Sequence, residues 1–493
     1  MARVRPLVRQ VPLPLALLLA VTAILSLSWS LATAPLQGPD ETDHVGYIEH
    51  LAETGKVPSA TSGTGGAYAA DEDAALQQAG LLRLLQNRLV RPPWSPQAEQ
   101  RFRSFEDTLS PAARETGGGP NSVAKNPPLY YAYAAVGWKL TPGGGFFGRL
   151  FLLRLLNGLM FLALVAFAWL VAGEAFRGRA VPQVVATGVV ALLPMAGFMS
   201  GIVNTDMMLA AMTAAFLWLA LRTSRLGLSW QRAALLSLTV VLAILTHGRG
   251  LALVPALAVA LGVAWLRHRG TLRSTALAAA GAGGVLVAGF IVYRVAASAA
   301  GNGGALYGGE VNLGNKNAFS IRQLLSSIWQ FYLPRLDSMA PRLGPAIGYR
   351  QIFVQQYFAG VFSSFEVYFP FWVYDTVQVA VLVLLVALYT MALLRWRPAL
   401  ASWPAIVILG ATLGSLLLFL HVASYRSLAN GSDNPLLVGR YLLPITPIVG
   451  VAVGAVVAGL PRRAGQIVGA VALVGLMALS LGGLALNVER FYA

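Results

Sequence analysis

The sequence predicts an all-α polytopic membrane protein, and three observations carry this prediction. Of the 493 residues, 56% are hydrophobic and only 11% are charged, and the mean hydropathy is +0.64, far from soluble averages. Many apolar runs of about 16–25 residues are long enough to cross a hydrocarbon core about 30 Å thick. Most arginines stand at the ends of these runs, and the alternating short segments of a β-barrel are absent.

Charge and cysteine content exclude several classes of function. The net charge is +16, which in a soluble protein would suggest a nucleic-acid partner. Here the arginines fix topology and meet lipid headgroups, so the bilayer is the expected partner and nucleic acid is not. The chain has no cysteine, which excludes disulfides, thiolate catalysis and Cys-ligated metals.

The first element, residues 1–34, is predicted to hold a transmembrane helix over about residues 12–34. Arg3, Arg5 and Arg9 precede it, so the N-terminus is expected on the cytoplasmic side. Ala32-Thr33-Ala34 resembles a signal-peptidase site, which leaves cleavage as an alternative. The apolar run is longer than a usual signal-peptide core, and this favours a retained helix.

A long outer loop is predicted over residues 35–149. It opens with Gly38-Pro39-Asp40-Glu41-Thr42-Asp43-His44, a carboxylate pair at the mouth of a membrane helix, where a functional site is the default hypothesis. Short helices are expected over 43–54, 74–89, 96–105 and 129–140, the last opened by the prolines of 126–131 (NPPLYY). Residues 143–148 match GxGxxG, but no strand precedes them, so a dinucleotide site is not expected.

The rest of the chain is predicted to form two bundles, 150–293 and 371–493, around a second outer loop, 294–370, with an interfacial helix at 321–332. Together with the first helix this makes about eleven spans. The other ten are 150–173, 182–201, 207–221, 233–245, 251–266, 275–293, 371–394, 403–420, 441–460 and 464–486. Basic pairs or triplets near residues 177, 225, 269, 396 and 462 all become cytoplasmic if the first helix runs outward. The second loop, the segments near residues 204, 248 and 430, and the C-terminus then lie outside.

The candidate site consists of polar residues that this topology gathers on the outer face. They are Asp40, Glu41, His44, Lys125, Asn204, Asp206, His247, Arg249, Glu366, Arg440 and Tyr441. No Walker A, HExxH or GxSxG sequence is present.

Four short motifs in a fixed order carry a resemblance. They are Pro39-Asp40-Glu41 with His44, then 126–131 (NPPLYY), 203–206 (VNTD) and 439–444 (GRYLLP). In these the chain resembles the DUF2142 family over nearly its whole length, and that family is similar in layout to GT-C glycosyltransferases such as the protein O-mannosyltransferase and aminoarabinose-transferase groups. The family often has His where this chain has Asn126, so no direct role is assigned to Asn126.

The resemblance implies an inverting transfer of a sugar from a polyprenyl-phosphate donor to a hydroxyl of a glycan, lipid or protein acceptor. The site would face outward from the cytoplasmic (inner) membrane, and no cofactor would be required. The residue types suit this chemistry, because a carboxylate can accept the acceptor's proton and cations can stabilise a leaving phosphate.

Roles follow for the residues around Asp40. Asp40 is predicted to be the general base, and its alternative is an N-cap of the following helix. Glu41, placed with it as catalytic, is expected to orient Asp40, bind a metal or pair with a basic residue. Because adjacent acids repel, one of the two is expected to keep its proton to a higher pH than usual. His44 would contact substrate or buffer charge.

The other residues are assigned to substrate binding. Arg440 is the first choice for the donor phosphate, with Lys125 and Arg249 as alternatives, and Tyr441 lies beside it. Asn204 and Asp206 would line the site or form a polar turn. His247 contacts substrate or, as its alternative, packs. For Glu366 the choices are an acceptor contact or a buried partner. Asp40, Glu41, Asp206 and Glu366 are oxygen ligands that leave a divalent cation open, although no spacing demands one.

Two other functions compete with the enzyme. A lipid or solute transporter or flippase would place ionisable residues near the midplane of broken helices, whereas here they concentrate at the outer ends of the spans. A non-catalytic accessory subunit would not need a carboxylate pair beside separated cations. The sequence leaves the sugar, the acceptor and the lipid length undetermined.

Overall fold

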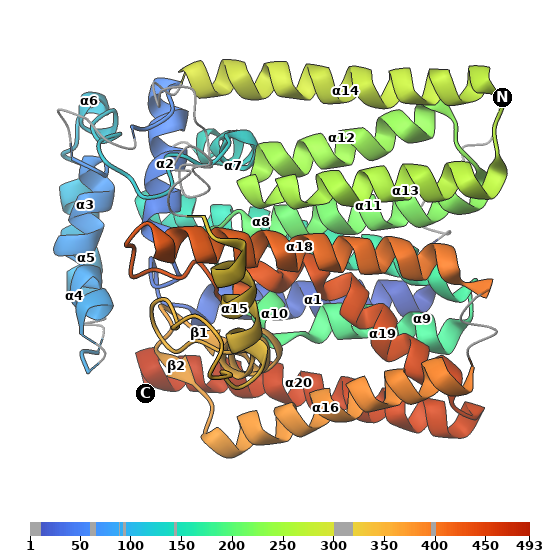
Figure 1. The fold of residues 1–493 in the computed structure, drawn as a ribbon. Helices are drawn as coiled ribbons and strands as arrows, with labels where there is room; N and C mark the ends of the chain where they lie inside the picture. Colours follow the sequence, from blue (N-terminus) through green and yellow to red (C-terminus); the bar gives the residue numbers. More distant parts are fainter. Residues whose placement is uncertain are drawn as a thin grey trace, which may run out of the picture.

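The computed structural model describes residues 11–59, 66–87, 89–91, 95–141, 145–299, 319–395 and 401–493. Its main feature is a bundle of long apolar helices that lie roughly side by side (Figure 1). The helices of the bundle are α1 (Leu13–Ala32), α8 (Gly145–Phe176), α9 (Ala180–Leu192), α10 (Pro194–Ser200), α11 (Asp206–Leu226), α12 (Trp230–Thr246), α13 (Leu253–His268), α14 (Leu272–Ala299), α16 (Phe371–Leu394), α18 (Trp403–Ala429), α19 (Thr446–Gly459) and α20 (Arg462–Tyr492).

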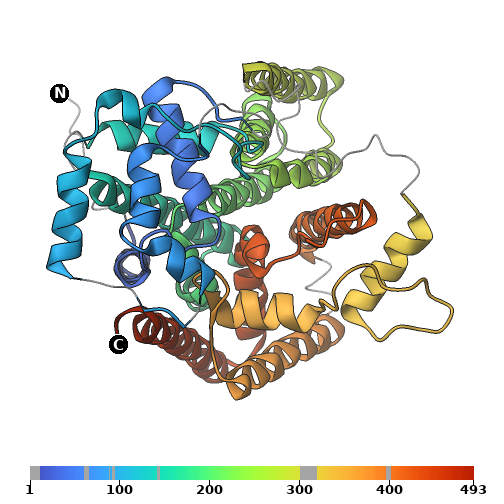
Figure 2. The same ribbon diagram turned by 90° about the vertical axis from the view of Figure 1, so that its left-hand side faces the viewer.

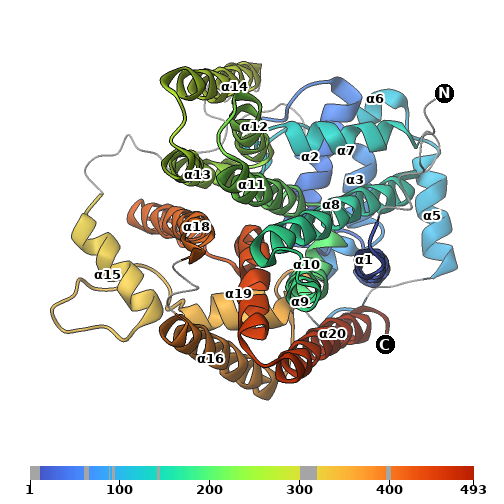
Figure 3. The ribbon, with the colours of Figure 1, turned by 90° about the vertical axis from the view of Figure 1, so that its right-hand side faces the viewer.

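The predicted all-α polytopic fold is confirmed. Within the described ranges, nine helices are long and apolar enough to cross a membrane, and the bent pair α9–α10 would make a tenth. The eleventh predicted span corresponds to α12, which has only 17 residues. The central helix α11 has 78% of its most apolar stretch buried, against 6% for α16, and Figure 3 shows α16 at the edge of the bundle seen end-on.

The span predicted over 182–201 is broken rather than straight. Pro194 begins α10, and the two helices meet at an angle of 53°. A proline has no N–H to donate and its ring clashes with the preceding turn, so it bends the path here. At the other end of α10, the carbonyls of Met199 and Ile202 have no helical partner and accept hydrogen bonds from the Asn157 amide, at 2.8 and 2.6 Å.

A layer of short helices covers the end of the bundle that also holds the C-terminus (Figures 1 and 2). Its helices are α2 (Glu41–Thr54), α3 (Ala70–Gln77), α4 (Leu81–Gln86), α5 (Pro96–Glu106), α6 (Pro111–Arg114) and α7 (Leu129–Lys139). The single helix predicted over 74–89 is wrong, because α3 and α4 are separated at Gly80, whose φ of 72° is left-handed. Of the GxGxxG match, Gly143 and Gly144 lie outside the described residues, and Gly145 already begins α8.

The segment predicted as the second outer loop, residues 294–370, contains more secondary structure than predicted. A helix lies where one was predicted, α15 (Ile321–Tyr332), and a π-helical segment (Arg350–Gly360) follows it. A small antiparallel hairpin comes next, β1 (Val361–Phe362) and β2 (Val367–Tyr368), so the described part of the chain carries two short strands that the sequence did not predict. The second outer loop is predicted to start at residue 294, and α14 continues to Ala299.

The hairpin closes the core of the bundle at this end. Trp29 of α1 is fully buried, and its ring centroid lies 5.5 Å from that of Phe198 in α10 and 4.8 Å from that of Phe362 in β1. Aromatic pairs in such geometries contribute beyond the area they bury. The C-terminal end of α1, from which the Asp40 loop departs, is therefore packed against aromatic rings of α10 and β1.

The predicted topology places one end of the bundle outside the cell and the other end in the cytoplasm, and this can be tested. We expect cysteines introduced at Thr116 and Ser432 to react with a membrane-impermeant maleimide in sealed cells, and one at Thr271 to react only after lysis. All three positions are exposed, the first two lie at the Asp40 end, and the native chain has no cysteine to interfere. The reason is the placement of basic connections on the cytoplasmic side. Labelling of the Thr271 variant in intact cells would contradict the predicted orientation.

The layer of short helices α2–α7 also buries a carboxylate, and this burial has an electrostatic cost. The Glu72 side chain of α3 is fully buried, and no described residue hydrogen-bonds to its carboxylate oxygens. Burial raises the pKa of Glu72 well above its ordinary value, and the nearby Asp71 and Asp43 raise it further. The folded protein therefore holds this proton more tightly than the unfolded chain does.

Glu72→Gln is accordingly expected to stabilise the protein in alkali. The stabilisation from a raised carboxyl pKa is complete below the unfolded value of about 4.5 and is lost as the pH rises through the folded value. Thermal unfolding in detergent should give the same midpoint for both proteins in acid and a higher midpoint for the variant at high pH. A constant difference across all pH values would contradict this origin.

Candidate active site

The structure brings eight of the eleven predicted site residues to one place at the mouth of the bundle. They come from the start of α2, the segment before α11, the connection from α12 to α13, and the 3-10 turn that precedes α19. These residues are Asp40, His44, Asn204, Asp206, His247, Arg249, Arg440 and Tyr441. Glu41, Lys125 and Glu366 have other surroundings.

Asp40 is the accessible carboxylate of this cluster. It directly precedes α2 with a left-handed φ of 59°, which Asp tolerates better than most residues. Its side chain makes no cap hydrogen bond to the helix, so the predicted N-cap alternative is not supported. Instead it forms an ion pair with Arg440 and remains 45% exposed, against 8% for the arginine.

The charge of Arg440 decides the protonation of Asp40. Burial raises the pKa of the Asp40 carboxyl, but the attraction of Arg440 and its hydrogen bond outweigh this, and the net pKa lies below the ordinary value. Asp40 is therefore not the acid of this adjacent pair that keeps its proton to a higher pH. The carboxylate is ionised at neutral pH and able to accept a hydrogen bond or a proton.

Arg440 is held by a tightly packed turn, Gly439–Ile445. The Gly439 N–H donates to Oε1 of Gln356 at 2.6 Å, and a Cβ at Gly439 would lie 2.4 Å from that of Gln356. Only glycine fits this approach. The guanidinium donates to Asp40 and, at 3.2 Å, to the Pro39 carbonyl, which ties the two most distant motifs of the sequence together.

Asp206 and Arg249 form a second ion pair in the cluster, and both side chains of this pair are buried. The Asp206 N–H donates to Oδ1 of Asn204 at 2.8 Å, so Asn204 fixes the first turn of α11. Nε of Arg440 lies 4.0 Å from Asp206, which links the two pairs. Arg249 donates from its backbone and Nε to Nδ1 of His247, at 3.1 and 3.3 Å, so packing beside Arg249, the alternative for His247, agrees with its contacts.

Both arginines retain donors that the described residues do not use. Nη1 of Arg249 and Nε of Arg440 are buried and have no hydrogen-bond partner in the described chain. The Tyr441 ring lies near both cations, with its centroid 4.0 Å from Cζ of Arg249 and 5.3 Å from that of Arg440. Unused buried N–H groups are costly, and an anion would satisfy them.

His44 forms one wall of the cluster. Nδ1 of His44 is 2.9 Å from the Tyr131 hydroxyl, and the Asn126 amide donates to that hydroxyl at 2.9 Å. Burial lowers the pKa of His44, and Arg440 adds to this against the opposing pull of Asp40, so the ring is neutral at neutral pH. Asn126 thus orients Tyr131 from the motif that opens α7.

Glu41 is enclosed by structural contacts. Its carboxylate is fully buried and accepts two 2.8 Å hydrogen bonds from Arg154 of α8, one from the Val203 N–H at 3.0 Å and one from the Gly38 N–H at 3.2 Å. Of the roles predicted for Glu41, pairing with a basic residue is the one that these contacts support. Arg154 itself was missed, although an arginine inside an apolar run is a sequence signal.

Two other predicted residues stand apart from the cluster. Lys125 is exposed. Glu366, in the β1–β2 turn, pairs with Arg490 near the C-terminus, 3.1 Å from Oε1 to Nε, which matches the predicted buried partner. The four carboxylates suggested as cation ligands each contact a different arginine, and in the described part of the chain no three acidic or histidine side chains are placed to hold a metal ion.

A family model described as "Predicted membrane protein (DUF2142)" matches residues 23–449. No curated protein matches the chain.

Two kinds of solved structure are similar to the chain at low identity. ArnT from Cupriavidus metallidurans bound to undecaprenyl phosphate is 17% identical with a TM-score of 0.46, over 92% of this chain and 62% of that one. The apo oligosaccharyltransferase of Archaeoglobus fulgidus is 13% identical with a TM-score of 0.45, over 97% of this chain and 56% of that one. The chain therefore spans less than two thirds of the length of either protein.

Proposed function

Because this chain belongs to the DUF2142 family of predicted membrane proteins, and because its cluster joins an accessible carboxylate to two buried arginines, we propose that it is a membrane glycosyltransferase of GT-C type. It transfers a sugar from a polyprenyl-phosphate donor to an acceptor hydroxyl on the outer face of the cytoplasmic membrane, with inversion. The observation that carries the proposal is the ion pair between Asp40 and Arg440, with unused donors on Arg440 and Arg249.

The reaction is a single displacement, in which one of these groups takes up a proton and the others stabilise the leaving phosphate. The acceptor hydroxyl gives its proton to the Asp40 carboxylate as its oxygen bonds to the anomeric carbon. On the opposite face of the sugar, the bond from that carbon to the phosphate oxygen breaks, and the electron pair leaves with the lipid phosphate. The two arginines stabilise that growing charge, which is where preorganised donors contribute most.

The ion pair also suggests an order of events. In the free protein Arg440 keeps Asp40 ionised and weakly basic. A donor phosphate near Arg440 shares that positive charge, which raises the proton affinity of Asp40 when the acceptor is to be deprotonated. Asp206 and Asn204 hold Arg249 in place, and His44 with Tyr441 borders the space in which the sugar would lie.

The direct test uses purified protein with a synthetic polyprenyl-phosphate sugar. Cleavage of the sugar–phosphate bond, seen as release of free polyprenyl phosphate and followed by mass spectrometry, should require the wild-type cluster. If the protein were instead a transporter, a different result would be expected in proteoliposomes. Movement of the intact lipid-linked sugar across the bilayer without cleavage would favour the transporter.

A further inference from the structure

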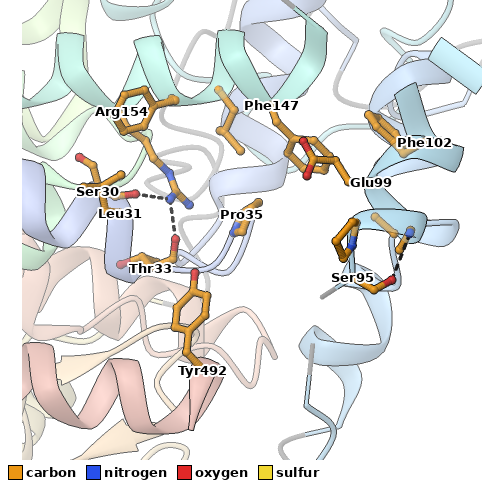
Figure 4. Close-up of a pocket in the computed structure, with 15 residues that line it drawn as sticks. Ser30, Leu31, Thr33, Pro35, Ser95, Glu99, Phe102, Phe147, Arg154 and Tyr492 are labelled. Atoms are coloured by element: carbon orange, nitrogen blue, oxygen red, sulfur yellow. Dashed lines mark hydrogen bonds between the residues drawn. The ribbon is translucent and has the colours of Figure 1, made fainter. Parts of the chain in front are cut away.

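A cavity of about 540 Å³ is lined by Arg154 but not by Asp40. Its walls come from the outer end of α1, the first turns of α8 and helix α5 of the outer layer, with Tyr492 at the end of α20 (Figure 4). We call it the α1–α5–α8 pocket. The side chains of Leu31, Phe102, Phe147 and Leu150 make most of it apolar, the usual character of a ligand cavity.

The mouth of the pocket continues the lipid-facing side of α1. Ile24, Leu27 and Leu31 are 64%, 43% and 60% exposed, and spacings of three and four residues place them on one face of the helix. Exposed apolar side chains on a membrane helix face hydrocarbon. Since Leu31 both ends this face and lines the pocket, a hydrocarbon chain in the bilayer has a continuous apolar path inward.

The electrostatics of the pocket disfavour a phosphate deep inside it. Among the described residues that line the pocket, Arg154 is the only cation. All five of its N–H groups are used, two on Glu41 and three on the carbonyls of Ser30, Thr33 and Ala34. Figure 4 shows the guanidinium bonded to the end of α1. Arg154 therefore has no N–H left for a charged group, which favours a hydrocarbon occupant.

None of the eight residues of the cluster around Asp40 lines this pocket. Within the candidate site, the unused donors suited to a phosphate belong to Arg249 and Arg440, and neither residue lines the pocket. A phosphate held by those two arginines would therefore lie outside it. We infer that the α1–α5–α8 pocket binds an acyl chain of a bilayer phospholipid, which supports the wall behind Glu41. This inference holds whether or not the protein transfers a sugar.

The test is photocrosslinking in nanodiscs of phosphatidylethanolamine that carries a diazirine within one acyl chain. In the wild-type protein, labelled peptides are expected from the outer end of α1, from α5 and from the start of α8. Leu31→Trp should block the mouth and reduce this labelling to background. Leu27→Trp, on the same exposed face but outside the pocket lining, should leave it unchanged.

A second pair of variants guards against misfolding of the first. Ala98→Trp fills the pocket from α5, whereas Gln100→Trp lies on an exposed position of the same helix outside the lining. Loss of labelling in the first and its retention in the second, with both eluting as monodisperse protein, supports the inference. Labelling that is uniform over the lipid-facing helices would overturn it. So would displacement of the phospholipid probe by a polyprenyl phosphate, which would assign the pocket to a prenyl chain.

Discussion

Asp40→Asn is expected to lower turnover by about 10²- to 10⁴-fold, the usual contribution of a general base. The substitution keeps the shape of the side chain but replaces one acceptor oxygen by an NH2 donor and removes the charged group that takes up the proton. Donor binding should survive, because the arginines that would hold the phosphate remain. The measurement is turnover of a synthetic polyprenyl-phosphate sugar by purified protein, with donor binding determined separately.

The acidic side of the pH profile provides a second readout of the same role. Arg440 keeps the pKa of Asp40 below its ordinary value of 3.8 in the free protein, so the base is ionised throughout the neutral and mildly acidic range. Loss of kcat/KM through protonation of Asp40 is therefore expected only below that value, since kcat/KM reports the free enzyme. An acid limb centred near neutral pH would point to another base.

Glu41→Gln is the variant to compare with Asp40→Asn, because it alters the neighbouring carboxylate. Its carboxylate is occupied by Arg154, Val203 and Gly38, so the variant leaves a buried arginine short of its partner. Breaking such a pair typically costs about 3 kcal/mol or more of stability. The variant should unfold at a lower temperature yet retain turnover where it is folded. Full activity of Asp40→Asn beside an inactive but stable Glu41→Gln would exchange the two roles.

Arg440→Ala is expected to lower turnover by about 10²- to 10³-fold, as when one preorganised donor to a developing charge is removed. The loss should exceed any loss of donor affinity, because the charge on the lipid phosphate grows as the glycosidic bond breaks. Arg440→Lys should recover only part of the rate, since an ammonium group cannot replace a planar guanidinium that contacts two partners.

The control for Arg440 is Arg350→Ala. Arg350 forms an exposed ion pair with Asp375, 2.5 Å from Nη2 to Oδ1, outside the cluster, and exposed pairs contribute little. Its removal should leave turnover unchanged. Near-normal turnover of Arg440→Ala would instead transfer the phosphate role to Arg249, which has an unused donor of its own, and Arg249→Ala would then carry the large loss.

The sequence by itself determined the class of the protein and most of the candidate site. Apolar runs long enough to span a bilayer and arginines at their ends follow from local composition, so they can be read without a fold. Asp40, Asp206, Arg249 and Arg440 were identifiable because an ionisable residue at the end of a membrane span is expensive unless it is used. The helix over 74–89 was mispredicted because one left-handed glycine outweighs helical composition.

Only the tertiary structure decided which charge meets which. Asp40 and Glu41 are neighbours in the chain, yet one pairs with Arg440, 400 residues away, and the other with Arg154 in α8. Partner choice depends on how helices distant in sequence pack, and the left-handed backbone of Asp40 just before α2 separates its side chain from that of Glu41, the first helical residue. Packing thereby turned an apparent carboxylate pair into an accessible acid and a buried structural one, because low-dielectric surroundings require each buried charge to find its own partner.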